Sequence, residues 1–130
     1  MKQEKDGTNH EFFYDSYALL AIVFGQKSYT PYTSGMRIVT TLMNLYEAYY
    51  ILLQKNLMGE AQQMFEQFLP FCTPIHPHTI IDAAHFRLIN HRKKISYVDA
   101  LGYTIAQQLH APFLTGDDAF KDMPNVEFVK

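Results

Sequence analysis

Two acidic residues follow segments that have the pattern of short strands. Asp15 comes directly after the aromatic segment 11–14, and Asp117 lies just past the apolar segment 112–115, with Asp118 beside it. In open parallel α/β sheets, ligands bind beyond the carboxyl ends of the strands. If the two strands are neighbours in one sheet, these carboxylates project into a common crevice, where they could bind a ligand together.

Two further acids stand out because of their surroundings. Glu47 is the only charged residue between Arg37 and Lys55, within an apolar helical pattern. Burying a lone carboxylate costs roughly several kcal/mol unless the group is paired or binds a metal. Asp99 lies one turn into a helix that we expect to begin at Ser96. The candidate acids at this point are therefore Asp15, Glu47 and Asp99, together with Asp117 and its neighbour Asp118.

Each acid also has an explanation that involves no chemistry. Asp15 could simply cap a helix, and Glu47 could lie exposed on the polar edge of an amphipathic helix. Ser96 and Asp99 have the spacing of a capping box, and Asp117 or Asp118 could be an ordinary turn residue. No single acid decides between a structural role and a role in a ligand site. The hypothesis of a shared site therefore depends on the order and setting of all the acids together.

The elements that must position these acids alternate between strands and helices. The spacing of apolar and β-branched residues predicts strands at 11–14, 37–40, 71–75, 112–115 and 126–129. It predicts helices at 17–24, 42–54, 60–69, 77–92 and 96–109, with a loop at 27–35 and a turn at 116–122. This alternation is typical of an α/β fold with a mainly parallel central sheet flanked by helices.

Length and composition indicate one globular domain. The chain has 130 residues, of which 48% are apolar and 18% charged. This length and composition suffice for one hydrophobic core without disulfides or structural metals. We expect residues 1–10 to form a flexible leader and residues 11–130 to form the domain. The single cysteine, Cys72, cannot form an internal disulfide, which fits a reducing cytoplasm. No apolar run is long enough to span a membrane, and the abundance of aromatic residues hints at an oligomer interface.

The charge balance argues only partly against a nucleic-acid partner. The net charge is −2, whereas nucleic-acid binders are usually basic. A site that holds a divalent cation concentrates acids, however, and the bound ion offsets their charge. The basic residues are locally clustered, either as a solvated helix end or as a patch that steers phosphates: Arg87, Arg92, Lys93 and Lys94, with Lys121 later in the chain.

Other common chemistries find little support in the sequence. His76 and His78 flank Pro77 at a predicted helix start, where exposed residues are the simpler explanation, and no Cys–His zinc pattern is present. No glycine-rich dinucleotide motif follows the first strand, and there is no P-loop. A phosphatase with an Asp nucleophile would want a second acid two places after Asp15, where this chain has Tyr17.

At these motifs the sequence resembles PIN domains, and within them the stand-alone VapC-type ribonucleases. That family has an Asp followed by Ser or Thr after its first strand, and a Glu in its second helix a few residues after a Ser or Thr. It also has a late Ser-x-x-Asp-Ala stretch and a Thr-x-Asp-x-x-Phe turn. The matching residues are Asp15-Ser16, Thr41 with Glu47, Ser96-Tyr97-Val98-Asp99-Ala100, and Thr115-Gly116-Asp117-Asp118-Ala119-Phe120. The chain departs from the family at Tyr17, where Asn is common, and at Ala119, where many members carry another acid.

The resemblance implies a three-layer PIN-like fold and a metal-dependent ribonuclease that hydrolyses RNA phosphodiesters. It assigns both catalysis and metal binding to Asp15, Glu47, Asp99 and Asp117, with Ser16, Thr115 and Asp118 as auxiliary residues. An all-oxygen ligand set suits Mg²⁺ or Mn²⁺. The expected partners are RNA, an antitoxin protein and a second copy of the chain. The alternative is a PIN-fold module that binds RNA or protein without cleaving it.

Overall fold

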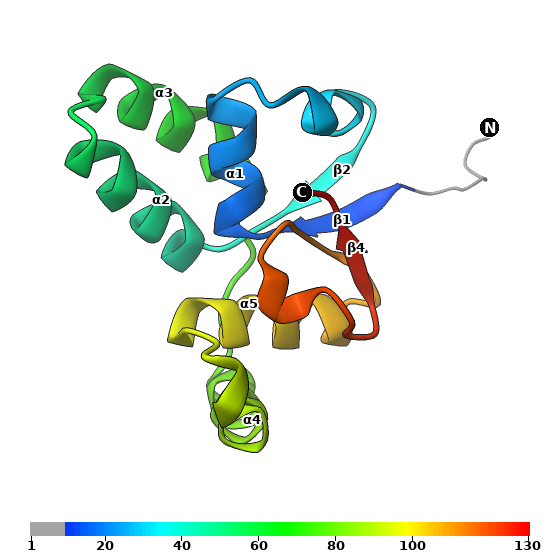
Figure 1. The fold of residues 1–130 in the computed structure, drawn as a ribbon. Coiled ribbons are helices and arrows are strands. Elements are labelled where there is room, and N and C mark those ends of the chain that lie inside the picture. The colour runs from blue at the N-terminus through cyan, green and yellow to red at the C-terminus, as the bar shows by residue number, and fades with distance from the viewer. Residues whose placement is uncertain (1–9) are drawn as a thin grey trace.

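The computed structural model describes residues 10–130, so the predicted leader lies almost entirely outside the described residues. Four parallel strands form one sheet in the order β2-β1-β3-β4 (Figure 1). They are β1 (Glu11–Tyr14), β2 (Arg37–Val39), β3 (Phe113–Thr115) and β4 (Val126–Phe128). The mainly parallel sheet and four of the five predicted strands are therefore confirmed.

The predicted strand at 71–75 is wrong. This segment contributes an isolated bridge between Cys72 and Thr40 rather than a strand of the sheet. Pro70 precedes the segment and Pro74 lies within it, and proline has no backbone N–H to donate to a ladder. The apolar composition of the segment therefore does not suffice to make it a strand.

Five α-helices lie where the sequence predicts them, within one to three residues at most ends. They are α1 (Ser16–Val23), α2 (Leu42–Gln54), α3 (Met58–Phe68), α4 (Pro77–Ile89) and α5 (Tyr97–Gln108). Short 3-10 turns occupy segments η1 (Lys27–Tyr32), η2 (Leu69–Phe71), η3 (His91–Lys93) and η4 (Asp118–Phe120). The predicted loop at 27–35 is thus partly helical, and helix α4 ends earlier than expected.

The sheet is buried on both faces. Neighbouring residues of a strand point to opposite faces, and Tyr14 accordingly packs in the core with α1, α2 and α3, while Phe13 packs in the core with α5. Both side chains are fully buried. Figure 1 shows α1, α2 and α3 on one side of the sheet and α5, with α4 beyond it, on the other. This is the three-layer arrangement that the resemblance to PIN domains implies.

Close packing of α5 on the sheet depends on Gly102. A Cβ atom at this position would lie 2.8 Å from Cε1 of Phe13 and 3.2 Å from Cε1 of Phe113. The absence of a side chain therefore lets α5 lie directly on strands β1 and β3. This contact fixes the position of α5, whose first turn carries Asp99, relative to the carboxyl ends of those strands.

Within residues 10–130, no helix combines the length and apolar character that crossing a membrane requires.

Candidate functional site

Asp15 lies at the carboxyl end of β1 and is 1% exposed. It occupies the N-cap position of α1, yet within the described chain its side chain makes no capping hydrogen bond. Instead, Oδ2 accepts a hydrogen bond from the hydroxyl of Thr115 at 2.7 Å. The other oxygen, Oδ1, is buried and has no hydrogen-bond partner among residues 10–130. Helix capping therefore does not explain this acid.

Burial raises the pKa of Asp15 well above its usual value, because a charge in a poorly solvated place is unfavourable. The negative charge of Asp99 raises this pKa further, and the charge of Glu47 adds to the effect. The hydrogen bond from Thr115 lowers it in part. Asp15 is thus a carboxylate whose ionised form lacks enough compensating charge in the protein itself.

Asp99 forms the capping box that its spacing with Ser96 predicts. The Ser96 hydroxyl accepts from the backbone N–H of Asp99 at 3.1 Å, and Oδ2 of Asp99 accepts from the backbone N–H of Ser96 at 3.3 Å. Burial nevertheless raises the pKa of Asp99 to about 6, with contributions from the charges of Glu47 and Asp117, against the lowering effect of the cap. The cap therefore orients Asp99 without compensating its charge.

Asp117 is tied to the same network through Thr115. Its backbone N–H donates to the Thr115 hydroxyl at 3.1 Å, and its Oδ1 accepts from the backbone N–H of Ala119 at 3.0 Å. This turn holds the half-buried carboxylate just beyond β3, next to the end of β1. The turn explanation and the site explanation of Asp117 are therefore compatible.

Glu47 completes the cluster from the first half of α2. Its side chain is half-buried rather than enclosed, so the apolar sequence around it overstated its burial. Its negative charge raises the pKa of both Asp15 and Asp99. The four acids thus come from four separate parts of the chain and interact electrostatically as one group, which we call the acid cluster: Asp15, Glu47, Asp99 and Asp117.

The three auxiliary residues have different surroundings. Thr115 bridges two members of the acid cluster, as described above. Asp118 is exposed and forms an ion pair with Lys130 at 3.0 Å, and the same ammonium donates to the carbonyl oxygen of Gly116 at 3.2 Å. Ser16 lies beneath the cluster and accepts a hydrogen bond from Nδ2 of Asn44 at 3.1 Å.

Sequence analysis missed Asn44. This residue is fully buried in the first turn of α2, and its Oδ1 accepts from the hydroxyl of Thr41 at 2.7 Å. The hydrogen bonds from Thr41 to Asn44 to Ser16 connect the start of α2 to the start of α1. The available signal was a polar residue three places after a helix-capping Thr, in an otherwise apolar turn.

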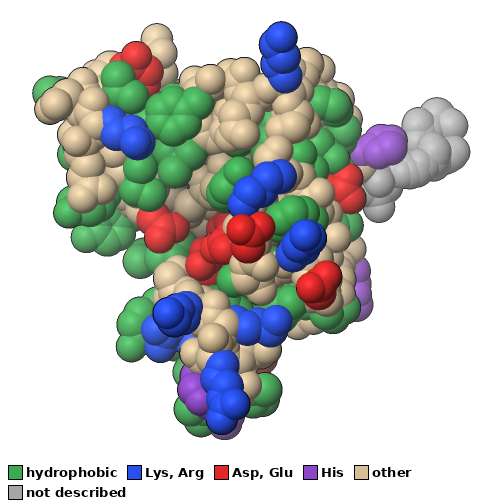
Figure 2. Space-filling view, in the orientation of Figure 1, with side chains coloured by type: hydrophobic (Ala, Val, Ile, Leu, Met, Phe, Trp, Pro, Cys, Tyr) green, Lys and Arg blue, Asp and Glu red, His purple; other side chains and the backbone are tan. Residues whose placement is uncertain are grey.

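The donor set fits a hard divalent cation, although the site is not preassembled. Within residues 10–130, no three or more His, Cys, Asp or Glu side chains already stand in an arrangement that could hold a metal ion. The acid cluster nevertheless supplies carboxylate oxygens alone, and the free Oδ1 of Asp15 is buried there without a donor. Figure 2 shows acidic side chains gathered at the centre of one face, with Lys and Arg side chains around them.

Other residues that could carry chemistry lie apart from the cluster. The rings of His76 and His78 stack on each other with centroids 6.0 Å apart, and both residues are exposed, as expected. Burial raises the pKa of the Cys72 thiol, which disfavours the reactive thiolate. Its Sγ lies 3.9 Å from the carbonyl oxygen of Phe68. Neither group suggests a second catalytic centre.

Comparison with known proteins gives a likeness at the level of the fold. No family model and no curated protein sequence matches the chain. Among solved structures, VapC20 of Mycobacterium tuberculosis, described as a sarcin-ricin loop cleaving toxin, is 14% identical with a TM-score of 0.78, and the match covers 92% of this chain and 99% of VapC20.

Two complexes contain chains of similar structure. A chain of VapBC2 of Rickettsia felis, bound to a promoter DNA fragment, matches with 17% identity and a TM-score of 0.71. The match covers 92% of this chain and 99% of the matched chain. A toxin–antitoxin complex from Klebsiella pneumoniae matches with 15% identity and a TM-score of 0.69, over 89% and 95%. The chain therefore has the α/β fold of the VapC-type structures, as the motif resemblance to PIN domains predicted.

Proposed function

We propose that this protein is a metal-dependent ribonuclease that hydrolyses RNA phosphodiesters, with Mg²⁺ or Mn²⁺ held by Asp15, Glu47, Asp99 and Asp117. The observation that carries the proposal is the buried, unpartnered Oδ1 of Asp15 inside a cluster of mutually repelling carboxylates. A buried polar atom without a partner costs about 1–3 kcal/mol. A divalent cation would remove both the missing contact and the repulsion.

The chemistry of the site follows from its oxygen donors. A bound divalent cation would supply a water of lowered pKa as nucleophile and would offset charge on the phosphate during attack. The residues of this chain hold the donors in place: Thr115 orients Asp15 and links it to Asp117, while the capping box orients Asp99. Glu47 stands half-exposed on α2. Cation binding would have to draw the carboxylates closer together.

RNA is the substrate that the available observations favour. VapC20, which shares the fold, is described as a sarcin-ricin loop cleaving toxin. The basic side chains of Arg92, Lys93 and Lys94 are exposed near the start of α5, which carries Asp99. Positive side chains beside a metal site attract the phosphates of a nucleic acid.

The test is cleavage of total RNA by the purified protein with Mn²⁺ or Mg²⁺, with and without a chelator, followed by mapping of the cut sites. Cleavage should need the metal and should be lost in Asp15→Asn. The matched control is Asp122→Asn, which removes an exposed acid outside the cluster. Full cleavage by Asp15→Asn would contradict the proposal. Metal and RNA binding without any cleavage would favour the non-catalytic module instead.

The same proposal extends to protein partners. The similar chains from Klebsiella pneumoniae and Rickettsia felis were solved in toxin–antitoxin and VapBC2 complexes. We therefore expect a small antitoxin to cover the acid cluster and block it. We also expect a homodimer, since large apolar side chains are exposed on α2 and α4, among them Tyr46, Leu53, Ile81 and Ile89. Copurification with the neighbouring gene product and sedimentation of the pure chain test these two expectations.

A further inference from the structure

An exposed aromatic residue begins the helix whose first turn carries Asp99 of the acid cluster. Tyr97 is the first residue of α5, two positions before Asp99, and 77% of its surface is exposed. The guanidinium carbon of Arg87 lies 4.0 Å from the centroid of its ring, a cation–π contact. Nε of Arg87 donates to the carbonyl oxygen of Ile95 at 2.9 Å. The arginine is therefore anchored, and it covers one part of a ring that otherwise faces solvent.

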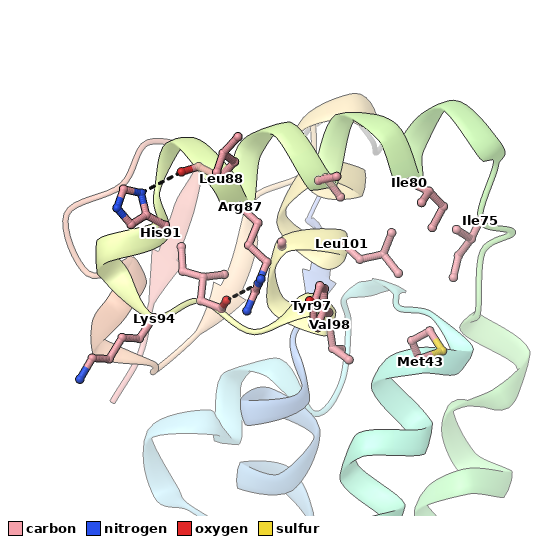
Figure 3. A pocket seen from close by; sticks show the side chains of 14 residues that line it. Met43, Ile75, Ile80, Arg87, Leu88, His91, Lys94, Tyr97, Val98 and Leu101 are labelled. Carbon is pink, nitrogen blue, oxygen red and sulfur yellow. Dashed lines mark hydrogen bonds between the residues drawn. The ribbon is translucent and has the colours of Figure 1, made fainter.

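Tyr97 borders an apolar cavity and also lies near basic side chains. A cavity of about 650 Å³ lies between α4 and α5, and its wall includes Ile80, Leu101 and Met43 at one end. Figure 3 shows these apolar side chains on one side, Arg87 beside Tyr97, and His91 and Lys94 at the other end.

The segment between Asp82 and Asp99 carries charge of one sign. Residues 83–98 contain no Asp or Glu, whereas they contain four exposed or half-exposed cations: Arg87, Arg92, Lys93 and Lys94. This positive segment borders the acid cluster through the first turn of α5. A ligand that lies along it therefore needs negative charges, and it needs flat apolar surfaces to contact the exposed ring.

We propose that Tyr97, backed by Arg87, is a stacking platform for an RNA base close to the scissile phosphate. The proposal rests on the proposed ribonuclease function and names a specificity-determining residue for it. Single-stranded RNA has both required features, phosphates along its backbone and a π-face on every base. An acidic protein segment satisfies the charge, but it does not specifically require a flat ring beside a guanidinium.

The geometry gives Tyr97 a defined role. Its backbone is fixed because Ser96 and Asp99 cap the helix that it begins. Arg87 restricts the ring further and presents a positive plane at its side. A base stacked here would bring the phosphates of its strand near the exposed lysines and the first turn of α5, which carries Asp99. Stacking tolerates any base, so Tyr97 would select unpaired rather than double-stranded RNA.

The experiment measures binding of a short single-stranded RNA, by fluorescence anisotropy, to Asp15→Asn protein that does not cleave it. Tyr97→Phe should bind as its parent does, and Tyr97→Leu should raise Kd by about tenfold, within the range known for single base–aromatic stacks. The matched control is Tyr50→Leu, which removes an exposed tyrosine from α2. In parallel, 2-aminopurine placed at each position in turn reports stacking directly, since its fluorescence is quenched when it stacks.

The expected result is quenching with the parent and with Tyr97→Phe, and its loss with Tyr97→Leu. Unchanged affinity or unchanged quenching in Tyr97→Leu overturns the inference, and so does failure of the parent to bind RNA. A shift from dimer to monomer in Tyr97→Leu on sedimentation would assign the ring to self-association instead.

The two proposals can fail separately. If wild type cleaves RNA, and Tyr97→Leu binds and cleaves RNA as well as wild type does, the stacking platform is ruled out and the ribonuclease function stands. RNA binding and quenching without metal-dependent cleavage would remove the ribonuclease and leave the platform.

Discussion

The hydroxyl of Thr115 lies 2.7 Å from Oδ2 of Asp15, although 100 residues separate the two along the chain. The contact exists because β1 and β3 are parallel neighbours whose carboxyl ends meet at the same edge of the sheet. The same hydroxyl accepts a hydrogen bond from the backbone of Asp117. One small side chain on β3 thereby sets the relative position of two members of the acid cluster.

Thr115→Val keeps the shape of this side chain and removes its hydroxyl. It leaves Oδ2 of Asp15 and the N–H of Asp117 without their partner, so we expect a stability loss of about 1–3 kcal/mol in urea unfolding. Metal-dependent cleavage should fall as well, since Asp15 is no longer oriented. Thr115→Ser keeps the hydroxyl and should retain most of both properties. Equal stability of Thr115→Val and wild type would show that the hydrogen bond contributes little.

The stability of the metal-free protein should depend on the protonation of Asp99. Its pKa in the folded chain is raised to about 6 from the ordinary value of 3.8, mainly by burial. Because the folded pKa is the higher one, this group stabilises the fold fully below about pH 4, and the contribution disappears as pH rises through about 6. Burial raises the pKa of Asp15 in the same direction.

The measurement is the urea midpoint in the presence of a chelator, compared between about pH 5 and about pH 7.5. Wild type should lose stability with rising pH relative to Asp99→Asn, in which this titration is absent. Asp122→Asn serves as the control and should follow wild type. The prediction fails if wild type and Asp99→Asn change in parallel across this range.

Removal of one carboxylate should have opposite effects with and without metal. In a chelator, Asp15→Asn should melt at a higher temperature than wild type, because it removes a buried charge that repels its neighbours. With Mn²⁺, wild type should gain stability by mass action while Asp15→Asn gains little. Thermal melts of both proteins, with Asp122→Asn as control, check this. A Mn²⁺ shift of equal size in wild type and Asp15→Asn would argue against a cation at Asp15.

The turn that carries Asp117 should not tolerate a side chain at Gly116. A Cβ atom there would lie 2.4 Å from both Cε1 of Tyr17 and the carbonyl oxygen of Val129. Gly116→Ala should therefore cost about 1–3 kcal/mol in urea unfolding and should displace Asp117. Removing the ring in Gly116→Ala/Tyr17→Ala would relieve only one of the two close contacts, since the Val129 carbonyl remains.

Gly59→Ala is the matched control for Gly116→Ala. A Cβ at Gly59 meets nothing within 4 Å, and the residue lies in helix α3. This substitution should leave the protein equally stable or stabilise it by about 0.4–1 kcal/mol. If Gly116→Ala behaves like Gly59→Ala, the close approach at the turn is not a constraint.

The sequence by itself determined the type and order of the elements. Apolar periodicity placed the helices, and the capping-box spacing of Ser96 and Asp99 marked the start of α5 correctly. It misjudged residues 71–75, where Pro74 and the preceding Pro70 disfavour a strand, and residues 27–35, where short-range bonds make a 3-10 turn. Local propensity is encoded in neighbouring residues, so a chain met for the first time already displays it.

Only the tertiary structure decided which polar residues act together. Asp15 occupies a cap position and could not be distinguished from a capping residue until Thr115, on another strand, proved to hold its side chain. Asn44 gave little sign of its burial, and Asp118 turned out to face Lys130 rather than the cluster. Such partners are chosen by the pairing of strands and the packing of helices. Those contacts join residues far apart in sequence, and no local pattern specifies them.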